Sequence, residues 1–197
     1  MVFKVKDYYF KKAKKENYVA RSVFKLEEID KKYNVLRSGD HVVDFGYHPG
    51  SWIQYTSKKV GNNGLVVGID IKTVSKKIAH LKNVQLYMQD IFGVEDLKDL
   101  GVDDKFDVVL SDMAPNTTGI KTVDQLRSLN LVEKVFDILP KFLKPNGNLI
   151  IKVFDSNDAQ VFLKSQKKIF SKINYLKPKS TRSVSKEFFV VATKYKG

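Results

Sequence analysis

The stretch that decides the fold is residues 41–50, with the sequence HVVDFGYHPG. It begins as a short apolar run, typical of a buried strand, and passes into a turn with glycine at positions 46 and 50. Glycine lets the backbone turn tightly and approach a ligand closely. We therefore predict a strand whose end forms part of a ligand-binding turn.

The alternation of strand-like and helix-like segments continues on both sides of this stretch. Further strands are predicted at 65–70, 84–88, 106–111, 148–154, 172–176 and 187–193. Helices are predicted at 18–32, 52–60, 122–139 and 158–170, the third of them ending near Pro140. Turns fall at 61–64 and 145–147. This order predicts an α/β fold with a mostly parallel, doubly wound sheet.

The composition excludes several classes of protein. A chain of 197 residues with 43% hydrophobic residues is long enough for one domain with a proper core. The absence of cysteine excludes disulfides, cysteine-ligated metals and a thiol nucleophile. Three scattered histidines argue against a histidine metal site, so we expect no metal. The apolar runs are too short to span a bilayer, and no secretory leader opens the sequence. We expect no membrane contact and no secretion.

The net charge of +13 is unevenly distributed. Residues 1–40 hold 11 basic and 6 acidic residues, residues 41–140 hold 11 and 13, and residues 141–197 hold 13 and 3. The three segments therefore carry +5, −2 and +10. Basic ends around a near-neutral middle indicate contact with a polyanion, although lysine-rich ends also occur as plain solvated faces.

Acidic residues stand at the ends of three predicted strands, where ligands bind in such sheets. They are Asp70, Asp90 and Asp112. The chain has neither G-x-G-x-x-G nor G-x-x-x-x-G-K-[ST], which disfavours dinucleotides and nucleoside triphosphates. A glycine turn with acidic strand ends suits a positively charged nucleoside such as S-adenosylmethionine. The alternative is that Asp70 and Asp90 only cap helices or turns.

Four ionisable residues stand in unusual contexts. Lys25 lies early in an amphipathic helix, Asp112 follows an apolar strand, Lys152 interrupts one, and Glu187 opens the last strand. A lysine within an apolar strand is costly unless its ammonium reaches a pocket or a partner. The alternatives are an edge-strand lysine at 152 whose ammonium reaches solvent and a solvated helix face at 25.

The chain resembles the FtsJ/RrmJ-type RNA 2′-O-ribose methyltransferases. The matching pieces are SVFKL at 22–26 with Glu28-Ile29, VDFG at 43–46 leading to PGSW at 49–52, SDMAPN at 111–116, IKVF at 151–154 and SKE at 185–187. They occur in family order over nearly the whole chain. The resemblance implies a Rossmann-like class I methyltransferase fold, a seven-stranded, mostly parallel sheet with helices on both faces and an antiparallel last strand.

The resemblance also implies site residues. The family's catalytic tetrad corresponds to Lys25, Asp112, Lys152 and Glu187. Its contacts to S-adenosylmethionine correspond to Gly46, Pro49, Gly50, Ser51, Trp52, Asp70, Asp90 and Asp112. The chain departs from the family at Tyr47-His48, where the family commonly has two small residues. Larger side chains there either crowd the methionine end of the cofactor or point outward. We interpret His48 as incidental, because the tetrad already supplies a base.

The implied reaction is methyl transfer from S-adenosylmethionine to a ribose 2′-hydroxyl, with Lys152 as the base. A lysine can accept a proton only when its side chain is a neutral amine. Burial and the positive charge of Lys25 are expected to favour the neutral amine of Lys152, whereas the negative charges of Asp112 and Glu187 are expected to favour the charged ammonium. We expect Lys25 to orient the hydroxyl, Asp112 to hold Lys152 and Glu187 to position the lysines.

The sequence MAPN at 113–116 and the short length of the chain most resemble the family members that act on large-subunit ribosomal RNA, at a uridine. The alternatives are a tRNA anticodon-loop methyltransferase, a non-catalytic RNA-binding or ribosome-assembly protein of the same fold and, least favoured, a Rossmann oxidoreductase. We expect the large ribosomal subunit as partner, a monomer, and a cytoplasmic protein if bacterial or an organellar one, such as mitochondrial, if eukaryotic.

We expect one domain over residues 1–197, with three parts. Residues 1–40 form a basic extension and helix, 41–120 the cofactor-binding half and 121–197 the substrate and catalytic half. Candidates for gripping RNA phosphates are Lys4, Lys6, Lys11, Lys12, Lys14, Lys15, Arg21, Lys177, Lys179, Arg182 and Lys186. Tyr8, Tyr9 and Phe10 are candidates for base stacking, and equally for packing against the domain.

Overall fold

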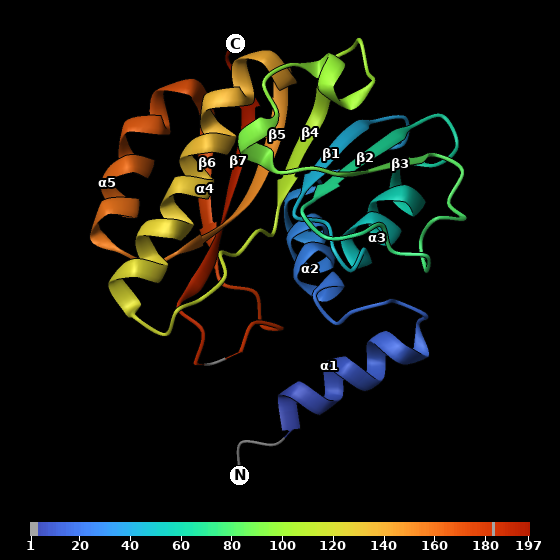
Figure 1. Cartoon of the computed structure of the whole chain (residues 1–197), viewed down its shortest axis with the longest axis horizontal. Helices are drawn as coiled ribbons and strands as arrows, with labels where there is room; N and C mark the ends of the chain where they lie inside the picture. The colour runs from blue at the N-terminus through green and yellow to red at the C-terminus, as the bar shows by residue number, and fades with distance from the viewer. Residues whose placement is uncertain (1–3, 183) are drawn as a thin grey trace.

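Strand β1, the predicted His41–Phe45 segment, lies near the centre of the sheet in the computed structural model (Figure 1). The structure describes residues 4–182 and 184–197. The other strands are β2 (Leu65–Asp70), β3 (Val84–Met88), β4 (Phe106–Ser111), β5 (Leu143–Phe154), β6 (Phe170–Leu176) and β7 (Glu187–Tyr195). The helices are α1 (Lys4–Lys15), α2 (Val23–Tyr33), α3 (Ser51–Val60), α4 (Lys121–Phe142) and α5 (Asn157–Ser165), with short 3₁₀ turns at Ile91–Gly93, Leu97–Leu100 and Gln166–Ile169.

The strand order is β3-β2-β1-β4-β5-β7-β6. Strands β1 to β5 pair in parallel, and β7 runs antiparallel to both β5 and β6. The predicted mostly parallel α/β sheet with an antiparallel last strand is therefore confirmed. Strand order reverses between β1 and β4, which places the ends of these two strands at the point where ligands bind in open sheets.

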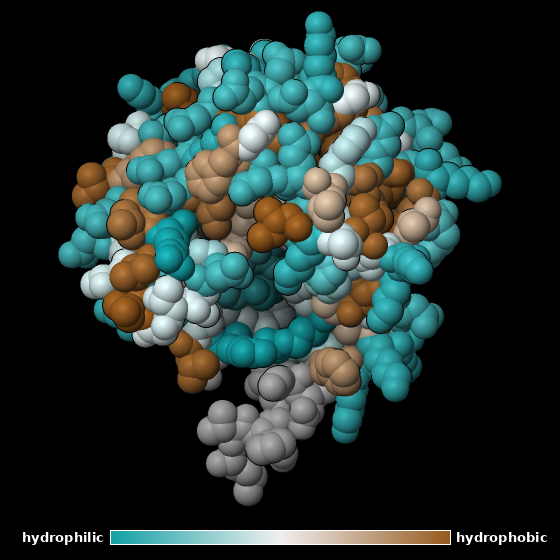
Figure 2. Space-filling model, viewed as in Figure 1, coloured by the Kyte–Doolittle hydropathy of each residue, from teal (hydrophilic) through white to brown (hydrophobic). Residues whose placement is uncertain are grey.

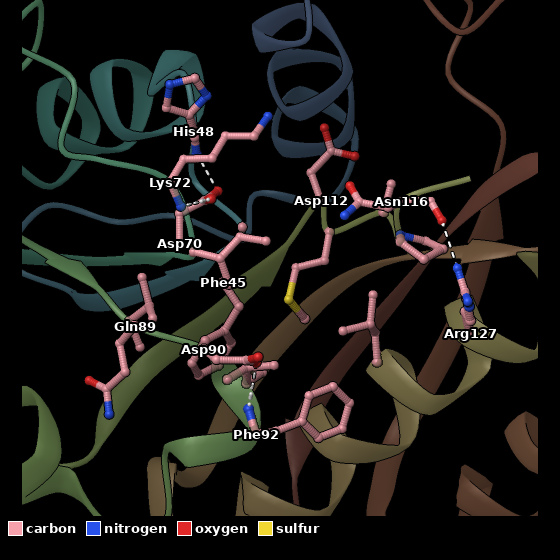
Figure 3. A pocket seen from close by; sticks show the side chains of 18 of the residues that line it. Phe45, His48, Asp70, Lys72, Gln89, Asp90, Phe92, Asp112, Asn116 and Arg127 are labelled. Carbon is pink, nitrogen blue, oxygen red and sulfur yellow. Dashed lines mark hydrogen bonds between the residues drawn. The ribbon is translucent and has the colours of Figure 1, made fainter. Parts of the chain in front are cut away.

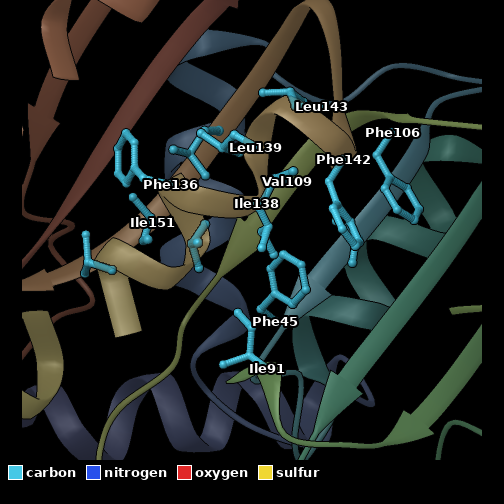
Figure 4. Packing of buried hydrophobic residues seen from close by; sticks show 14 of the residues in the cluster. Phe45, Ile91, Phe106, Val109, Phe136, Ile138, Leu139, Phe142, Leu143 and Ile151 are labelled. Carbon is cyan, nitrogen blue, oxygen red and sulfur yellow. The ribbon is translucent and has the colours of Figure 1, made fainter. Parts of the chain in front are cut away.

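Helices cover both faces of the sheet (Figure 1). Helices α4 and α5 pack on one face, where Phe45, Phe106 and Phe142 belong to a large apolar cluster (Figure 4). Helices α2 and α3 pack on the other face, with Val42, Leu110 and Ile150 in a second cluster. Successive residues of a strand point to opposite faces. Whether a residue occupies an odd or an even position in its strand thus decides which helices its side chain packs against.

Several boundaries differ from the sequence-based prediction. Helix α1 lies in the segment expected to be a basic extension, for which no separate helix is predicted. The helix predicted over 18–32 is α2, which begins at Val23 rather than at Tyr18. Helix α4 was expected to end near Pro140 but continues to Phe142, because proline in a last turn costs one hydrogen bond while Leu139 and Phe142 are buried. Strand β5 includes residues 145–147, where a turn is predicted. Its pairing with β4 shifts register there, between the partners of Phe106 and Val108. The helix predicted to reach Phe170 ends at Ser165.

The structure also bears on the membrane question. Among the residues that it describes, no helix is long and apolar enough to cross a bilayer.

Candidate active site

Strand register brings three of the four predicted tetrad residues to the same end of the sheet. Lys152 of β5 lies opposite Phe189, and Phe154 lies opposite Glu187, so Lys152 and Glu187 are close neighbours on two paired strands. Ser111 of β4 lies opposite Ile151, which places Asp112 beside Lys152. Ile150 and Phe189 both point toward α2 and α3. Lys152 and Glu187 are each two residues away from one of these, so their side chains lie on the same face and point toward α2, the helix that carries Lys25.

The four side chains form two linked ion pairs. Lys25 Nζ donates to Glu187 Oε1 at 2.6 Å. Lys152 Nζ lies 3.0 Å from Asp112 Oδ1 and donates to the backbone carbonyl of Asp112 at 2.7 Å. Lys25 Nζ is also 4.0 Å from Asp112 Oδ1, which joins the two pairs. The structure thus brings together residues that are up to 162 positions apart in the chain.

This tetrad is largely shielded from water. The side-chain exposures of Lys25, Lys152, Asp112 and Glu187 are 13%, 6%, 18% and 14%. Two cations and two anions balance one another, so the cluster carries no net charge when all four are ionised. Charges in a site with little water interact more strongly than at a surface, and removal of one leaves its partner uncompensated.

A cavity of about 510 Å³ lies at the ends of the central parallel strands (Figure 3). We call it the strand-end cavity. Asp70 and Asp90 line one side of it and Asp112 the other, and the apolar lining includes Phe45 and Met113. Gly46 also lines it. The predicted cofactor residues Gly46, Asp70, Asp90 and Asp112 therefore meet at one cavity, of a size typical for a small-molecule site.

Two of these carboxylates also organise the local backbone. Asp70 accepts hydrogen bonds at 2.9 Å from the amides of His48 and Lys72, which ties the glycine turn to the end of β2 (Figure 3). Asp90 accepts from the amide of Phe92 at 3.0 Å and caps a 3₁₀ turn. The capping role considered for both residues is thus present, and each oxygen retains lone pairs that can face the cavity.

The structure does not bring Pro49, Gly50, Ser51 or Trp52 to the strand-end cavity. Ser51 Oγ lies 2.8 Å from Ser22 Oγ, and Trp52 Nε1 donates to the Ser22 carbonyl at 2.9 Å. Ser22 directly precedes α2, so these contacts hold the start of the helix that carries Lys25. Sequence position within the turn did not reveal this, because α3 begins at Ser51 and turns its first residues toward α2.

The side chains of Tyr47 and His48, where the chain departs from the family, lie in different surroundings. The Tyr47 side chain is buried in the α2 and α3 cluster, away from the cavity. His48 lines the cavity. The larger residue of the pair therefore does not crowd the cavity, and only His48 borders it.

A second cavity, of about 810 Å³, lies where the starts of α4 and α5 meet the loop before β7. We call it the loop cavity. Glu187 and Phe188 of β7 line it together with three lysines, Lys121, Lys177 and Lys186. Asp112 lines the strand-end cavity and Glu187 lines the loop cavity, so each cavity reaches one carboxylate of the tetrad. A reactant in either cavity can therefore meet a group of the linked ion pairs.

Asp44 is a buried polar residue for which the sequence interpretation gave no role. It is 1% exposed, and neither carboxylate oxygen has a hydrogen-bond partner. Burial raises the pKa of the Asp44 carboxyl well above its ordinary value, and the negative charges of Asp112 and Asp70 raise it further. In the sequence, the sign that Asp44 is a buried acid is its position within the otherwise apolar run 42–45. Asp30 is equally buried but accepts bonds from Val35, Leu36 and Tyr55.

Asp44→Asn is expected to change the pH dependence of stability. Where the unfolded carboxyl is ionised and the buried one is protonated, the folded state binds more protons, so stability falls as pH rises from about 4 through the raised pKa. Asparagine removes this loss. The variant's free energy of unfolding, relative to the parent's, should be greater at pH 8 than at pH 5 by on the order of 1 kcal/mol in urea titrations.

Asp30→Asn is the matched control and should lower stability at both pH values, because it breaks a satisfied buried network. Parallel pH profiles for the parent and Asp44→Asn would contradict the interpretation of Asp44.

Within the described residues, no three His, Asp or Glu side chains gather as they would around a metal ion.

The model of the FtsJ-like methyltransferase family matches residues 18–195. The chain belongs to the FtsJ-like methyltransferase family. The matched range includes all four tetrad residues and both cavities, whereas α1 lies outside it.

Relatives within the family span the chain almost completely. The chain is 45% identical over 192 residues to the ribosomal RNA large subunit methyltransferase E of Bdellovibrio bacteriovorus, covering 97% of each. It is 43% identical over 197 residues to the protein of the same name in Brachyspira hyodysenteriae, covering 98% of this chain and 97% of that one. A crystal structure described as a ribosomal RNA methyltransferase of Plasmodium falciparum superposes with a TM-score of 0.79 at 27% identity, over 91% of this chain and all of that one.

Proposed function

We propose that this protein transfers a methyl group from S-adenosylmethionine to a ribose 2′-hydroxyl of RNA, and that its substrate is large-subunit ribosomal RNA, at a uridine. The observation that carries the proposal is the tetrad, whose Asp112 lines the strand-end cavity and whose Glu187 lines the loop cavity. Lys152 contacts Asp112 at 3.0 Å, and Lys25 contacts Glu187 at 2.6 Å. The names of the relatives support the ribosomal substrate, and their bacterial origin favours the cytoplasm over an organelle.

The strand-end cavity fits the proposed cofactor. Its carboxylates, Asp70, Asp90 and Asp112, suit a ligand with a sulfonium and an ammonium, and Phe45, Ile91 and Met113 offer apolar contact to a purine ring. S-adenosylmethionine supplies an electrophilic methyl group when bound. We assign Asp70 and Asp90 to the ribose and base side of the cavity and Asp112 to the side that faces the tetrad.

The chain's own residues then prepare the hydroxyl. Lys152 Nζ would accept the proton that the 2′-hydroxyl gives up, which makes the ribose oxygen a stronger nucleophile. Asp112 holds Lys152 through its backbone carbonyl and its carboxylate, and Glu187 holds Lys25 at 2.6 Å. Lys25, which lies 4.0 Å from Asp112 Oδ1, orients the hydroxyl.

The experiment that tests the proposal compares three substrates. Labelled S-adenosylmethionine is incubated with purified large ribosomal subunits that lack 2′-O-methylation, with naked large-subunit RNA and with tRNA. We expect label in the first or second and none in tRNA. Transfer to tRNA alone would establish the anticodon-loop alternative, and binding of ribosomal RNA without any transfer would establish the non-catalytic one.

Gly46→Ala is expected to weaken cofactor binding at least about tenfold. Gly46 has φ +80°, and a Cβ there would lie 2.4 Å from Met113 Cγ, a cavity-lining side chain. The matched control is Gly39→Ala, which shares the left-handed conformation at φ +86° but meets no atom within 4 Å. It should bind cofactor within about twofold of the parent, so calorimetric titration with S-adenosylmethionine separates crowding at the cavity from backbone strain. Equal affinities of the two variants would contradict the assignment of Gly46.

The basic ends are expected to make RNA binding salt-dependent. Lys11, Lys14 and Lys15 are exposed on α1, and Lys177 and Lys186 line the loop cavity. Tyr9 packs against Phe24 with ring centroids 5.5 Å apart, so Tyr8 and Phe10, at 61% and 64% exposure, remain as stacking candidates. The face in Figure 2 is mostly hydrophilic, with small separate apolar groups. RNA affinity should fall at least about tenfold between 50 and 200 mM salt in filter-binding assays. A flat response would contradict an electrostatic grip.

A further inference from the structure

The turn after β1 carries the two residues at which this chain departs from its family, and one of them has a side chain without a partner. His48 lines the strand-end cavity. Its backbone amide donates to Asp70 Oδ2 at 2.9 Å, but among the described residues no hydrogen bond or ion pair involves its imidazole. The residue is half-buried, so a ring that can donate a hydrogen bond is held at the cavity with no group of the protein to receive it.

Tyr47 fixes the direction in which His48 points. The Tyr47 ring packs in the cluster under α2 and α3 and lies over Gly68 of β2, where a Cβ would come 2.9 Å from Tyr47 Cδ1. Glycine at 68 leaves the space that the ring occupies, so Tyr47 anchors the turn on that face of the sheet. The next residue, His48, is directed to the cavity instead. The two large residues thus act together, since one anchors the turn and the other borders the ligand site.

His48 lies at one end of the cavity. Figure 3 shows His48 and Lys72 at the end away from Asp90 and Phe92, with Asp70 between the two ends. We assign the base and the ribose of the proposed cofactor to the side of Asp70 and Asp90. The end that holds His48 is therefore left for the methionine part.

The methionine part ends in a carboxylate, and the cavity is already rich in carboxylates. They are Asp70, Asp90 and Asp112. These residues suit the sulfonium and the ammonium, but they repel the ligand's own carboxylate unless a donor of the protein meets it. The cavity must therefore offer a donor at the methionine end.

Three basic side chains line the cavity and could supply this donor. Arg127 already donates to the carbonyl of Asn116 at 3.2 Å. Lys72 is exposed, so its ammonium can stay in water. His48 is half-buried, and Asp70 holds its backbone in place. A short side chain fixed in this way loses little freedom when it binds a ligand, which favours His48 over Lys72.

We infer that the His48 imidazole donates a hydrogen bond to the α-carboxylate of S-adenosylmethionine. A neutral imidazole donates one N–H and a charged one donates two, so a donor is present in either form. A hydrogen bond to a charged group is stronger than one between neutral groups. This inference rests on the proposed function and assigns His48 to cofactor binding rather than to base catalysis.

The test measures by calorimetric titration how three ligands bind to the parent, to His48→Ala and to a control variant. S-adenosylmethionine and S-adenosylhomocysteine carry the carboxylate, whereas decarboxylated S-adenosylmethionine keeps the sulfonium and the ammonium but lacks it. His48→Ala should raise the Kd of the first two about tenfold and leave that of the third within about twofold of the parent's. The control is His80→Ala, which changes an exposed histidine outside the cavity and should alter none of the three Kd values.

His48→Gln keeps an N–H donor and should bind S-adenosylmethionine within about threefold of the parent. Equal affinities of the parent and His48→Ala for S-adenosylmethionine would overturn the inference. An equal loss for all three ligands would also overturn it, because a distorted turn does not distinguish ligands by their carboxylate. So would a tenfold loss in Lys72→Ala with none in His48→Ala. Failure of the proposed function is distinct from these results, because the parent protein would then bind no S-adenosylmethionine or methylate no RNA.

Discussion

Lys152→Ala is expected to lower methyl transfer by at least about a thousandfold while cofactor affinity stays within about threefold of the parent's. Lys152 is the one tetrad residue that reaches Asp112 through two contacts, 2.7 Å to the carbonyl and 3.0 Å to the carboxylate, and its side chain is only 6% exposed. Loss of a general base costs a factor of about 10² to 10⁴. Single-turnover transfer from labelled S-adenosylmethionine and calorimetric titration measure the two effects separately.

The same strand provides a control for this prediction. Lys144, at the start of β5, also pairs with a carboxylate, lying 2.9 Å from both oxygens of Asp107, but at the opposite end of the sheet. Lys144→Ala should retain transfer within about twofold. Lys152→Arg should be as inactive as the alanine variant, because a guanidinium keeps the charge but does not give up its proton. Substantial turnover by either Lys152 variant would sink the assignment of Lys152 as base.

Asp112→Asn is expected to impair both halves of the site. Its Oδ1 lies 3.0 Å from Lys152 Nζ and 4.0 Å from Lys25 Nζ, and the residue lines the strand-end cavity. The substitution leaves two largely buried ammonium groups with a single carboxylate and removes a negative charge from the cavity. Transfer should fall at least about a hundredfold and S-adenosylmethionine affinity about tenfold. Breaking a buried ion pair costs about 3–5 kcal/mol, so the Tm should fall by roughly 6–20 °C.

Asp107→Asn is the matched control for Asp112→Asn. Asp107 lies in β4, pairs with Lys144 and accepts from the His41 amide at 2.9 Å, so its loss should lower the Tm without changing cofactor affinity. If Asp112→Asn binds cofactor normally and turns over normally at a permissive temperature, Asp112 has only a structural role.

The outline of the fold follows from the order and spacing of apolar segments. All seven strands and four of the five helices coincide with predicted segments, because hydrophobic periodicity reports which residues face a core. The ends were harder to predict. Helix α4 passes through Pro140 and β5 begins at Leu143, because burial of Leu139, Phe142 and Leu143 outweighs the local turn and breaker signals. Helix α1 joins the core mainly through Ala13 and Tyr9, whereas Tyr8 and Phe10 are exposed, so its apolar residues do not report one buried face.

The amino-acid sequence alone determined the residue types of the site. The acidic strand ends and the four ionisable residues in unusual contexts stand out from their surroundings, and the family resemblance implies that those four form one tetrad. Only the tertiary structure decided what each residue touches. Trp52 and Ser51 belong to the same short turn as Gly46, yet they support the start of α2, and Asp44 and Asp30 are equally buried although only Asp30 has partners. The physical reason is that contacts depend on strand register and helix docking, which join residues far apart in sequence and leave no local pattern.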